Sequence, residues 1–344
     1  MAAPILNRSG AVIGALYGER RRSPLPSGRF TELEAKLVEL LARGVAAGLA
    51  RLEEERKALQ HRVQFEQFFT PELARQLMSK PDMLEGQDRE VTVLFADIRG
   101  FSRMSEELGA ARTISWCRDV LDMLSEAVFK EGGVVVDYVG DGLMGMWGAP
   151  DDQPDHAVRA CRAALAILKG LPGLNDRWLP TLKEPIGLGI GINTGMAQVG
   201  NVGSRHKFKY GALGNTVNVA SRVQGATKYF KCKVLITGQT QAKLDATFLT
   251  RRMGRVKLVG IKEPFDLHEM FASDWALAPA AKNEYEKALK LYEEQQFSQA
   301  ARMLGNWRGQ CPTDDPVLVL LLRAVRAMVE GPQAGQLVWE LTEK

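Results

Sequence analysis

The chain has 344 residues, which is more than one average domain, so its length predicts two or three folded units. Its apolar content of 45% and charged content of 25% suit ordinary globular cores, and a formal net charge of +4 argues against a nucleic-acid surface. The four cysteines lie far apart, which argues against a zinc site or a disulfide framework and favours a reducing compartment. Because no secretory leader or membrane span is evident, we expect a cytoplasmic protein that binds neither membrane nor nucleic acid.

Residues 1–64 predict a strand pair followed by a long helix. Strands are expected at 3–6 and 11–17, and a helical pattern runs from residue 30 to about residue 63. Apolar residues recur along this helix at heptad spacing, which is typical of a short parallel coiled coil, but packing on its own domain produces the same pattern. The strand pair and helix resemble the C-terminal part of a GAF sensory domain, which implies a signalling helix behind an incomplete sensor.

Two further segments flank the central part of the chain. In residues 65–87, Phe68-Phe-Thr-Pro-Glu72 carries a helix-start signature and predicts a linker helix. Residues 273–344 are again helical in pattern and resemble one tetratricopeptide-type hairpin with an added helix. Because one such repeat cannot bury its own apolar face, we expect this tail to dock on a neighbouring domain or a protein partner, or to be a generic helical cap.

In the central part, residues 88–272, strands and helices alternate as in an α/β domain. Two of its apolar segments each carry an aspartate. Asp97 is expected just past a strand at 91–96, and Asp141 lies in a Gly-Asp-Gly hairpin turn. Turn chemistry alone explains one such aspartate. Two carboxylates at one place repel each other unless a cation lies between them, and carboxylate oxygens are ligands that Mg²⁺ accepts, so the pair predicts a divalent-cation site.

A third segment places an amide and a guanidinium on one face of a helix. Asn218 and Arg222 are four residues apart in a helix that Gly214-Asn215 opens. An arginine offers a fork of donors to phosphate oxygens, and an asparagine can hold a ribose or phosphate group. Either residue alone is common on helix surfaces, so the prediction depends on their combination with the aspartates.

These segments resemble the catalytic domain of the class III nucleotidyl cyclases, which comprise adenylate and guanylate cyclases. The resemblance covers about residues 88–272 and implies a ferredoxin-like α/β (α+β) fold, with an antiparallel-rich sheet flanked by helices. The matching pieces are Phe95-Ala-Asp97-Ile-Arg-Gly-Phe-Ser102, Gly140-Asp141, Gly195-Met-Ala-Gln-Val-Gly200-Asn-Val-Gly203 and Gly214-Asn-Thr-Val-Asn218-Val-Ala-Ser-Arg222.

The resemblance also implies roles for individual residues. Asp97, Asp141 and the backbone carbonyl of Ile98 would bind two Mg²⁺ or Mn²⁺ ions, while Asn218 would orient the ribose and Arg222 would stabilise the transition-state phosphate. The family pairs two catalytic domains head to tail, so a homodimer is implied in which one subunit holds the metals and the other supplies Asn and Arg.

Other residues are candidates for contacts to the nucleoside triphosphate. Phe101 lies within the first motif, and Arg205 and Lys207 fall where the family often contacts phosphate. Where many members have Leu-Lys-Gly-Lys, this chain has Leu258-Val-Gly-Ile261, so a triphosphate-binding lysine is missing unless Lys257 or Lys262 replaces it.

Base selection in the family depends on two positions, which Asp137 and Gly211 hold here. An acidic Asp137 can accept hydrogen bonds from guanine N1–H and its amino group, whereas adenine N1 needs a donor. This favours GTP slightly, family frequency favours ATP, and both substrates stay open. The unusual base pocket also keeps open an alternative function, a degenerate cyclase domain that only binds nucleotide or dimerises in signal transduction.

Overall fold

The structure is a computed structural model that describes residues 1–7, 9–19, 30–66, 85–204, 209–272, 275–331 and 337–341, with side chains left out at 57–66. It divides into two compact units, residues 1–78 and 79–344. Most of the predicted linker helix at 65–87 lies outside the described residues, so that prediction stays untested.

The first unit contains the predicted strand pair and long helix. Strands β1 (Ala2–Leu6) and β2 (Val12–Tyr17) form an antiparallel hairpin, and α1 spans Glu32–Glu66. A capping box starts the helix, because Glu34 accepts a hydrogen bond from the Thr31 backbone N–H at 2.7 Å while the Thr31 hydroxyl accepts one from Glu34 N–H at 3.3 Å.

The inner face of α1 packs on this hairpin. Val38 and Ala42 of the helix contact a small apolar cluster that includes Ile5 of β1. Val38 and Ala42 begin the apolar heptad series that continues along the helix at Val45, Leu49 and Leu52, so part of the predicted pattern serves packing within the unit. Leu37 and Leu41 lie on another face of α1 and are exposed.

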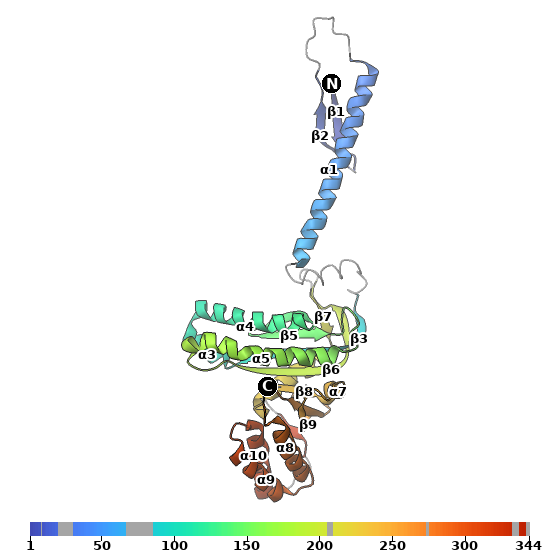
Figure 1. Cartoon of the computed structure of the whole chain (residues 1–344). Helices are drawn as coiled ribbons and strands as arrows, with labels where there is room; N and C mark the ends of the chain where they lie inside the picture. Colours follow the sequence, from blue (N-terminus) through green and yellow to red (C-terminus); the bar gives the residue numbers. More distant parts are fainter. Residues whose placement is uncertain are drawn as a thin grey trace. The chain divides into compact units, whose positions relative to one another are not determined.

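A single sheet forms the centre of the second unit (Figure 1). In the described part of the chain it has nine strands in the order β11-β9-β10-β8-β6-β3-β5-β4, with β7 paired to β6. The pairs β6–β8 and β9–β11 are parallel and the others are antiparallel. The strands are β3 (Gln87–Arg99), β4 (Val134–Val139), β5 (Gly142–Trp147), β6 (Gly187–Asn201), β7 (Tyr210–Leu213), β8 (Val234–Thr237), β9 (Thr250–Lys257), β10 (Phe265–Met270) and β11 (Trp339–Glu340).

Helices cover both faces of this sheet. Successive side chains of a strand point to opposite faces, and in β8 Val234 and Ile236 join one apolar core while Leu235 joins the other. The first core includes α4 and α5, and the second includes α6 and the C-terminal helices. The mixed α/β fold, with an antiparallel-rich sheet flanked by helices, is as predicted. The helices are α3 (Phe101–Leu108), α4 (Ala110–Lys130), α5 (His156–Leu182), α6 (Asn215–Phe230), α7 (Gly238–Gln241), α8 (Ala278–Glu293), α9 (Phe297–Gln310) and α10 (Asp315–Glu330).

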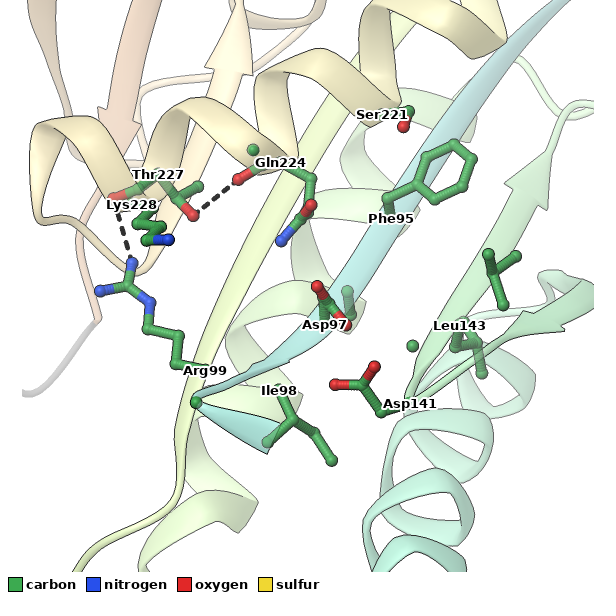
Figure 2. Close-up of a pocket in the computed structure, with 15 residues that line it drawn as sticks. Phe95, Asp97, Ile98, Arg99, Asp141, Leu143, Ser221, Gln224, Thr227 and Lys228 are labelled. Carbon is green, nitrogen blue, oxygen red and sulfur yellow. Dashed lines mark hydrogen bonds between the residues drawn. The ribbon is translucent and has the colours of Figure 1, made fainter. Parts of the chain in front are cut away.

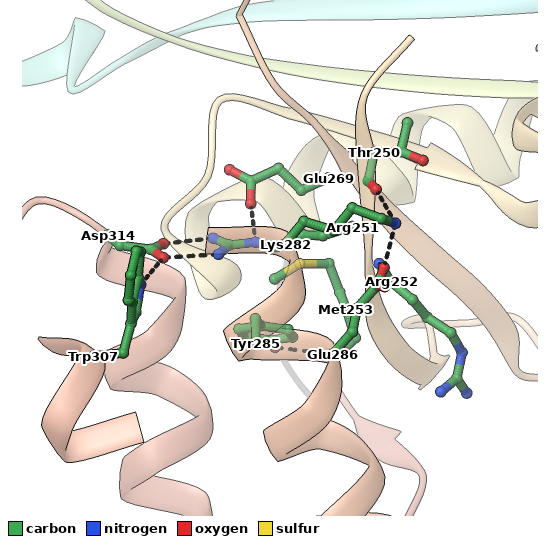
Figure 3. A network of polar contacts seen from close by, with 10 residues as sticks. All are labelled: Thr250, Arg251, Arg252, Met253, Glu269, Lys282, Tyr285, Glu286, Trp307 and Asp314. Carbon is green, nitrogen blue, oxygen red and sulfur yellow. Dashed lines mark hydrogen bonds and ion pairs between the residues drawn. The ribbon is translucent and has the colours of Figure 1, made fainter. Parts of the chain in front are cut away.

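The C-terminal helices α8, α9 and α10 are fixed to the sheet by a buried arginine (Figure 3). The fully buried guanidinium of Arg251 in β9 bonds to Glu269 of β10 at 2.6 Å and to both carboxylate oxygens of Asp314, just before α10, at 2.6 and 2.9 Å. The Trp307 indole of α9 also donates to Asp314, at 2.9 Å. The apolar face expected to need a neighbour is therefore covered by this chain's own sheet.

One predicted boundary was wrong. The strand before Asp97 was expected to end at residue 96, but β3 continues to Arg99, and α3 follows after Gly100, whose φ is +72°. Strand β3 is longer because β6 pairs with it as far as Arg99, beyond the last β5 pairing at Ala96. Helix α5 runs without interruption to Leu182 although Pro172 and Pro180 lie inside it. None of the described helices combines the length and apolar content that crossing a membrane requires.

Candidate active site

A cavity of about 600 Å³ lies between the end of β3, the turn joining β4 to β5, and one face of α6 (Figure 2). Both predicted metal aspartates, Asp97 and Asp141, line it together with Ile98. The other lining residues are Phe95, Ala96, Arg99, Gly100, Val139, Gly142, Leu143, Ser221, Gln224, Gly225, Thr227 and Lys228.

Strand register explains why the two aspartates meet. The pairing of β3 with β5 ends at Ala96 and Leu143, so the next residue of β3, Asp97, faces the turn that carries Asp141. Asp97 was predicted just past the strand, whereas it lies within β3, paired with β6 alone. The turn comes very close: a Cβ at Gly142 would lie 2.6 Å from the Ala96 carbonyl oxygen and 3.2 Å from Asp97 Oδ1. Only glycine allows this approach.

The electrostatics of the cavity indicate a place for a cation. Burial and the neighbouring Asp141 carboxylate raise the pKa of Asp97 to about 6 from its ordinary 3.8, while the Ile98 backbone N–H lowers it in part. A divalent cation bound between the carboxylates would relieve this repulsion. Among the described residues no three His, Cys, Asp or Glu side chains cluster as a ready-made metal site. Two carboxylates completed by a backbone carbonyl and by substrate phosphates are the kind of ligand set that Mg²⁺ accepts.

Asn218 and Arg222 lie on α6 as predicted, but neither residue lines the cavity. Ser221, Gln224 and Lys228 of this helix line the cavity, and the Gln224 side chain extends toward Asp97 (Figure 2). Asn218 is exposed and Arg222 is half-buried. Within the described part of the chain, neither side chain makes a hydrogen bond or an ion pair. The structure therefore brings the two aspartates together but does not bring Asn218 and Arg222 to them within one chain.

The two predicted base-selecting positions are occupied in ways that the sequence did not indicate. The Asp137 carboxylate pairs with Lys209 Nζ at 2.6 Å, and Lys209 was not among the predicted site residues. Gly211 of β7 lies against Val136 of β4, because a Cβ at Gly211 would come within 2.5 Å of Val136 Cγ1. The Val136 side chain thus fills the space that a side chain at residue 211 would need.

The remaining candidates are more scattered. The Phe101 ring stacks on Trp116 with centroids 5.3 Å apart and does not line the cavity. Lys257 pairs with Glu340 of β11 at 3.1 Å. Arg205 and Lys207 lie outside the described residues.

Comparison with known proteins assigns the second unit. A model of the adenylate and guanylate cyclase catalytic domain matches residues 84–271, which include both aspartates, Asn218 and Arg222. The chain belongs to this family. The resemblance of the sequence motifs to class III nucleotidyl cyclases is thereby confirmed, whereas the GAF-like and tetratricopeptide-like resemblances stay predictions.

Relatives of this cyclase-family chain include proteins named as adenylate cyclases and proteins named as guanylate cyclases. Adenylate cyclase 1 of Rhizobium meliloti is 34% identical over 182 residues, which are 53% of this chain and 27% of the relative. An adenylate cyclase of Anabaena cylindrica is 32% identical over 219 residues, 60% of this chain and 43% of the relative. The soluble guanylate cyclase gcy-32 of Caenorhabditis elegans is 28% identical over 225 residues, 64% of this chain and 32% of the relative. The chain spans less than half the length of each.

A solved structure agrees with the fold. The adenylyl cyclase CyaB from P. aeruginosa superposes with a TM-score of 0.52 at 31% identity, covering 56% of this chain and 98% of that one. The matched share of this chain corresponds to one catalytic domain, so the remaining segments have to be explained from their own structure.

Proposed function

We propose that this chain is a homodimeric class III nucleotidyl cyclase that converts a purine nucleoside triphosphate, GTP or ATP, to the 3′,5′-cyclic monophosphate and pyrophosphate. One observation carries the proposal. Asp97 of β3 and Asp141 of the turn between β4 and β5 line one cavity in a chain of the cyclase family. The proposed product serves signal transduction, with residues 1–64 as a sensory and signalling segment, 65–87 as a linker, 88–272 as the catalytic domain and 273–344 as a helical tail.

In this proposal Asp97, Asp141 and the Ile98 backbone carbonyl hold two Mg²⁺ or Mn²⁺ ions. When bound, the ions favour deprotonation of the ribose 3′ hydroxyl and neutralise charge on the triphosphate. The 3′ oxygen then forms a bond to the α-phosphorus, and the bond from that phosphorus to the bridging oxygen of pyrophosphate breaks. The carboxylates of Asp97 and Asp141 would supply the negative charge that holds such ions in the cavity.

The remaining contacts come from a second copy of the chain. Asn218 orients the ribose, and the Arg222 guanidinium donates hydrogen bonds to phosphate oxygens as charge develops on them. Two observations support this division of labour: neither residue lines the cavity of its own chain, and neither side chain has a partner in the described part of that chain.

In this proposal the purine base contacts Lys209, a hydrogen-bond donor, and Asp137, an acceptor, which form an ion pair with each other. With guanine, the carboxylate would accept from N1–H and the ammonium would donate to O6. With adenine, the ammonium would donate to N1 and the carboxylate would accept from the amino group. The pair is therefore compatible with both purines, in line with relatives of both kinds.

The proposal is tested by incubating the purified chain with Mg²⁺ or Mn²⁺ and each of the four ribonucleoside triphosphates, and measuring cyclic product. Asp97→Ala and Arg222→Ala are each expected to be inactive alone. A mixture of the two should recover about one quarter of wild-type activity, since about half of the dimers are mixed and each has one intact site. Absence of product from every nucleotide, at concentrations where the chain is dimeric, would leave the alternative of a nucleotide-binding or dimerising module.

A further inference from the structure

Strand β6 presents three glycines of one face, Gly189, Gly191 and Gly195, to helix α6. A Cβ at Gly189 would lie 2.4 Å from Thr227 Oγ1, and one at Gly191 would lie 2.0 Å from the backbone nitrogen of Gln224. At Gly195 it would lie 2.9 Å from Thr216 Oγ1. Such contacts are too short for real side chains, so α6 rests directly on the backbone of β6.

Asn193 is the one position in this row, between Gly191 and Gly195, that carries a side chain. Its Nδ2 donates to the backbone carbonyl of Thr216 at 2.9 Å, and its Oδ1 accepts from the Thr237 hydroxyl at 2.7 Å. The side chain is only 4% exposed and the Thr237 side chain is fully buried. Losing one partner of a buried bond of this kind leaves the other polar group without compensation for lost water.

The bond reaches α6 beside the residues proposed to contact substrate. Thr216 lies in the first turn of the helix, and its hydroxyl also donates to the Met196 carbonyl at 2.5 Å. Asn218 follows two residues later, and Arg222 lies one turn beyond Asn218. The glycines give close contact without hydrogen bonds from their side chains, whereas the bonds made by Asn193 and Thr216 are directional and fix the start of α6 at one position along β6.

We propose that Asn193 is a positioning residue for the cyclase reaction: it fixes α6 on β6 so that Asn218 and Arg222 are aimed at the site of the partner subunit. This inference rests on the proposed function. The inference assigns Asn193 to the half of the shared site that contains Asn218 and Arg222. Asn193 nevertheless lies on β6, which pairs with β3, the strand that carries Asp97.

The first measurement is the steady-state kinetics of Asn193→Ala. We expect kcat to fall by about 10- to 100-fold, with a smaller change in KM, because misplacing a transition-state contact by about 1 Å has that effect. Thr194→Val is the matched control. Thr194 is the next residue, equally buried and hydrogen-bonded to Thr92 and Thr240 at 2.8 and 3.0 Å, but it makes no bond to α6. Its kcat should stay within about twofold of wild type once folded protein is counted.

The deciding measurement is subunit mixing. Asn193→Ala mixed with Asp97→Ala should recover activity, because one mixed site has intact carboxylates from the first variant and an intact α6 from the second. Asn193→Ala mixed with Arg222→Ala should recover none, because both defects lie on the same side. Equal recovery in both mixtures, or in neither, overturns the proposal provided that Asp97→Ala and Arg222→Ala restore each other.

Two further outcomes complete the design. If the Asp97→Ala and Arg222→Ala mixture itself stays inactive while the wild type is active, the shared site is wrong and the positioning role falls with it. If Asn193→Ala does not fold, Asn193→Asp replaces it: the carboxylate keeps the Thr237 bond but cannot donate to the Thr216 carbonyl, so the same one-sided mixing pattern is expected.

Discussion

The two halves of the proposed site differ in how completely one chain builds them. The carboxylate half, Asp97 and Asp141, converges inside a single cavity, and the pKa of Asp97 is raised by burial and by its neighbour. The helix half, Asn218 and Arg222, lies on a flank of α6 with no partner in the described residues of its own chain. One half is therefore assembled and under electrostatic repulsion, whereas the other is presented outward. A single chain offers a place for cations but not a complete place for substrate.

The largest expected effect is the loss of cyclase activity in variants of either half, and mixing these variants shows to which half each residue belongs. Asp97→Asn, Asp141→Asn and Arg222→Ala should each lower cyclase activity by about 1000-fold or more, since each removes charge stabilisation that the reacting phosphate depends on. Cyclic product is measured for each variant and for pairwise mixtures. Mixtures across the halves should recover activity, but Asp97→Asn with Asp141→Asn should not.

Asp176→Asn is the control for these variants, because Asp176 is an exposed carboxylate on α5. Its activity should equal that of wild type. Recovery in the mixture of the two aspartate variants would contradict the comparison, because it would place Asp97 and Asp141 in different halves of the site.

Motifs revealed the residues of both halves, and the family resemblance implied that two subunits supply them, but local patterns did not place every residue within the fold. Asp141 in its glycine turn, and the spacing of Asn218 and Arg222 on a helix, could be read from local patterns. The position of Asp97 could not, because the end of β3 is set by its pairing with β6, far away in the sequence. Which face of α6 meets the cavity depends on packing against that sheet, which helical periodicity alone does not determine.

Other features could not be predicted from the sequence for the same reason, because they depend on contacts between residues far apart in the chain. Lys209 bonds to Asp137 across 72 positions of the chain, so no local motif marks the pair. Arg251 looks like an ordinary surface cation until β9, β10 and α10 enclose it. The glycine row of β6, by contrast, is visible in the sequence as Gly at residues 187, 189, 191 and 195, and its alternation indicates a close backbone approach.

The second expected effect concerns recognition of the base, for which neither half as defined above accounts. Lys209→Ala should shift the ratio of GTP to ATP turnover toward GTP by about tenfold, because it leaves Asp137 as an acceptor alone. Asp137→Ala should shift the ratio toward ATP by a similar factor. The ratio of kcat/KM for the two nucleotides is the measurement.

Lys130→Ala serves as control, because Lys130 pairs with Glu126 at 2.8 Å on the exposed surface of α4. It should leave the ratio unchanged. If Lys209→Ala and Asp137→Ala lower turnover of both nucleotides equally, the pair positions structure and does not read the base.

The smallest expected effect is on stability, and it distinguishes the halves without any substrate. Because the pKa of Asp97 is about 6 in the folded chain and near 3.8 when exposed, the folded state binds the proton more tightly. The contribution of Asp97 to the stability of the metal-free chain should therefore be greatest below about pH 4 and be lost as the pH rises through about 6. Asp97→Asn lacks this loss, so at neutral pH and above it should be more stable than wild type by about 1 to 2 kcal/mol, allowing for partial solvent screening.

Arg222→Ala, on the half without repulsion, should change stability by less than about 0.5 kcal/mol at any pH. Urea unfolding across this pH range measures the free energy of unfolding of metal-free wild type, Asp97→Asn and Arg222→Ala. Adding Mg²⁺ or Mn²⁺ should stabilise wild type but not Asp97→Asn. If Asp97→Asn is less stable than wild type at neutral pH, the two carboxylates do not repel each other in the folded chain. The carboxylate half would then be no more strained than the helix half, and the contrast between them would rest on position alone.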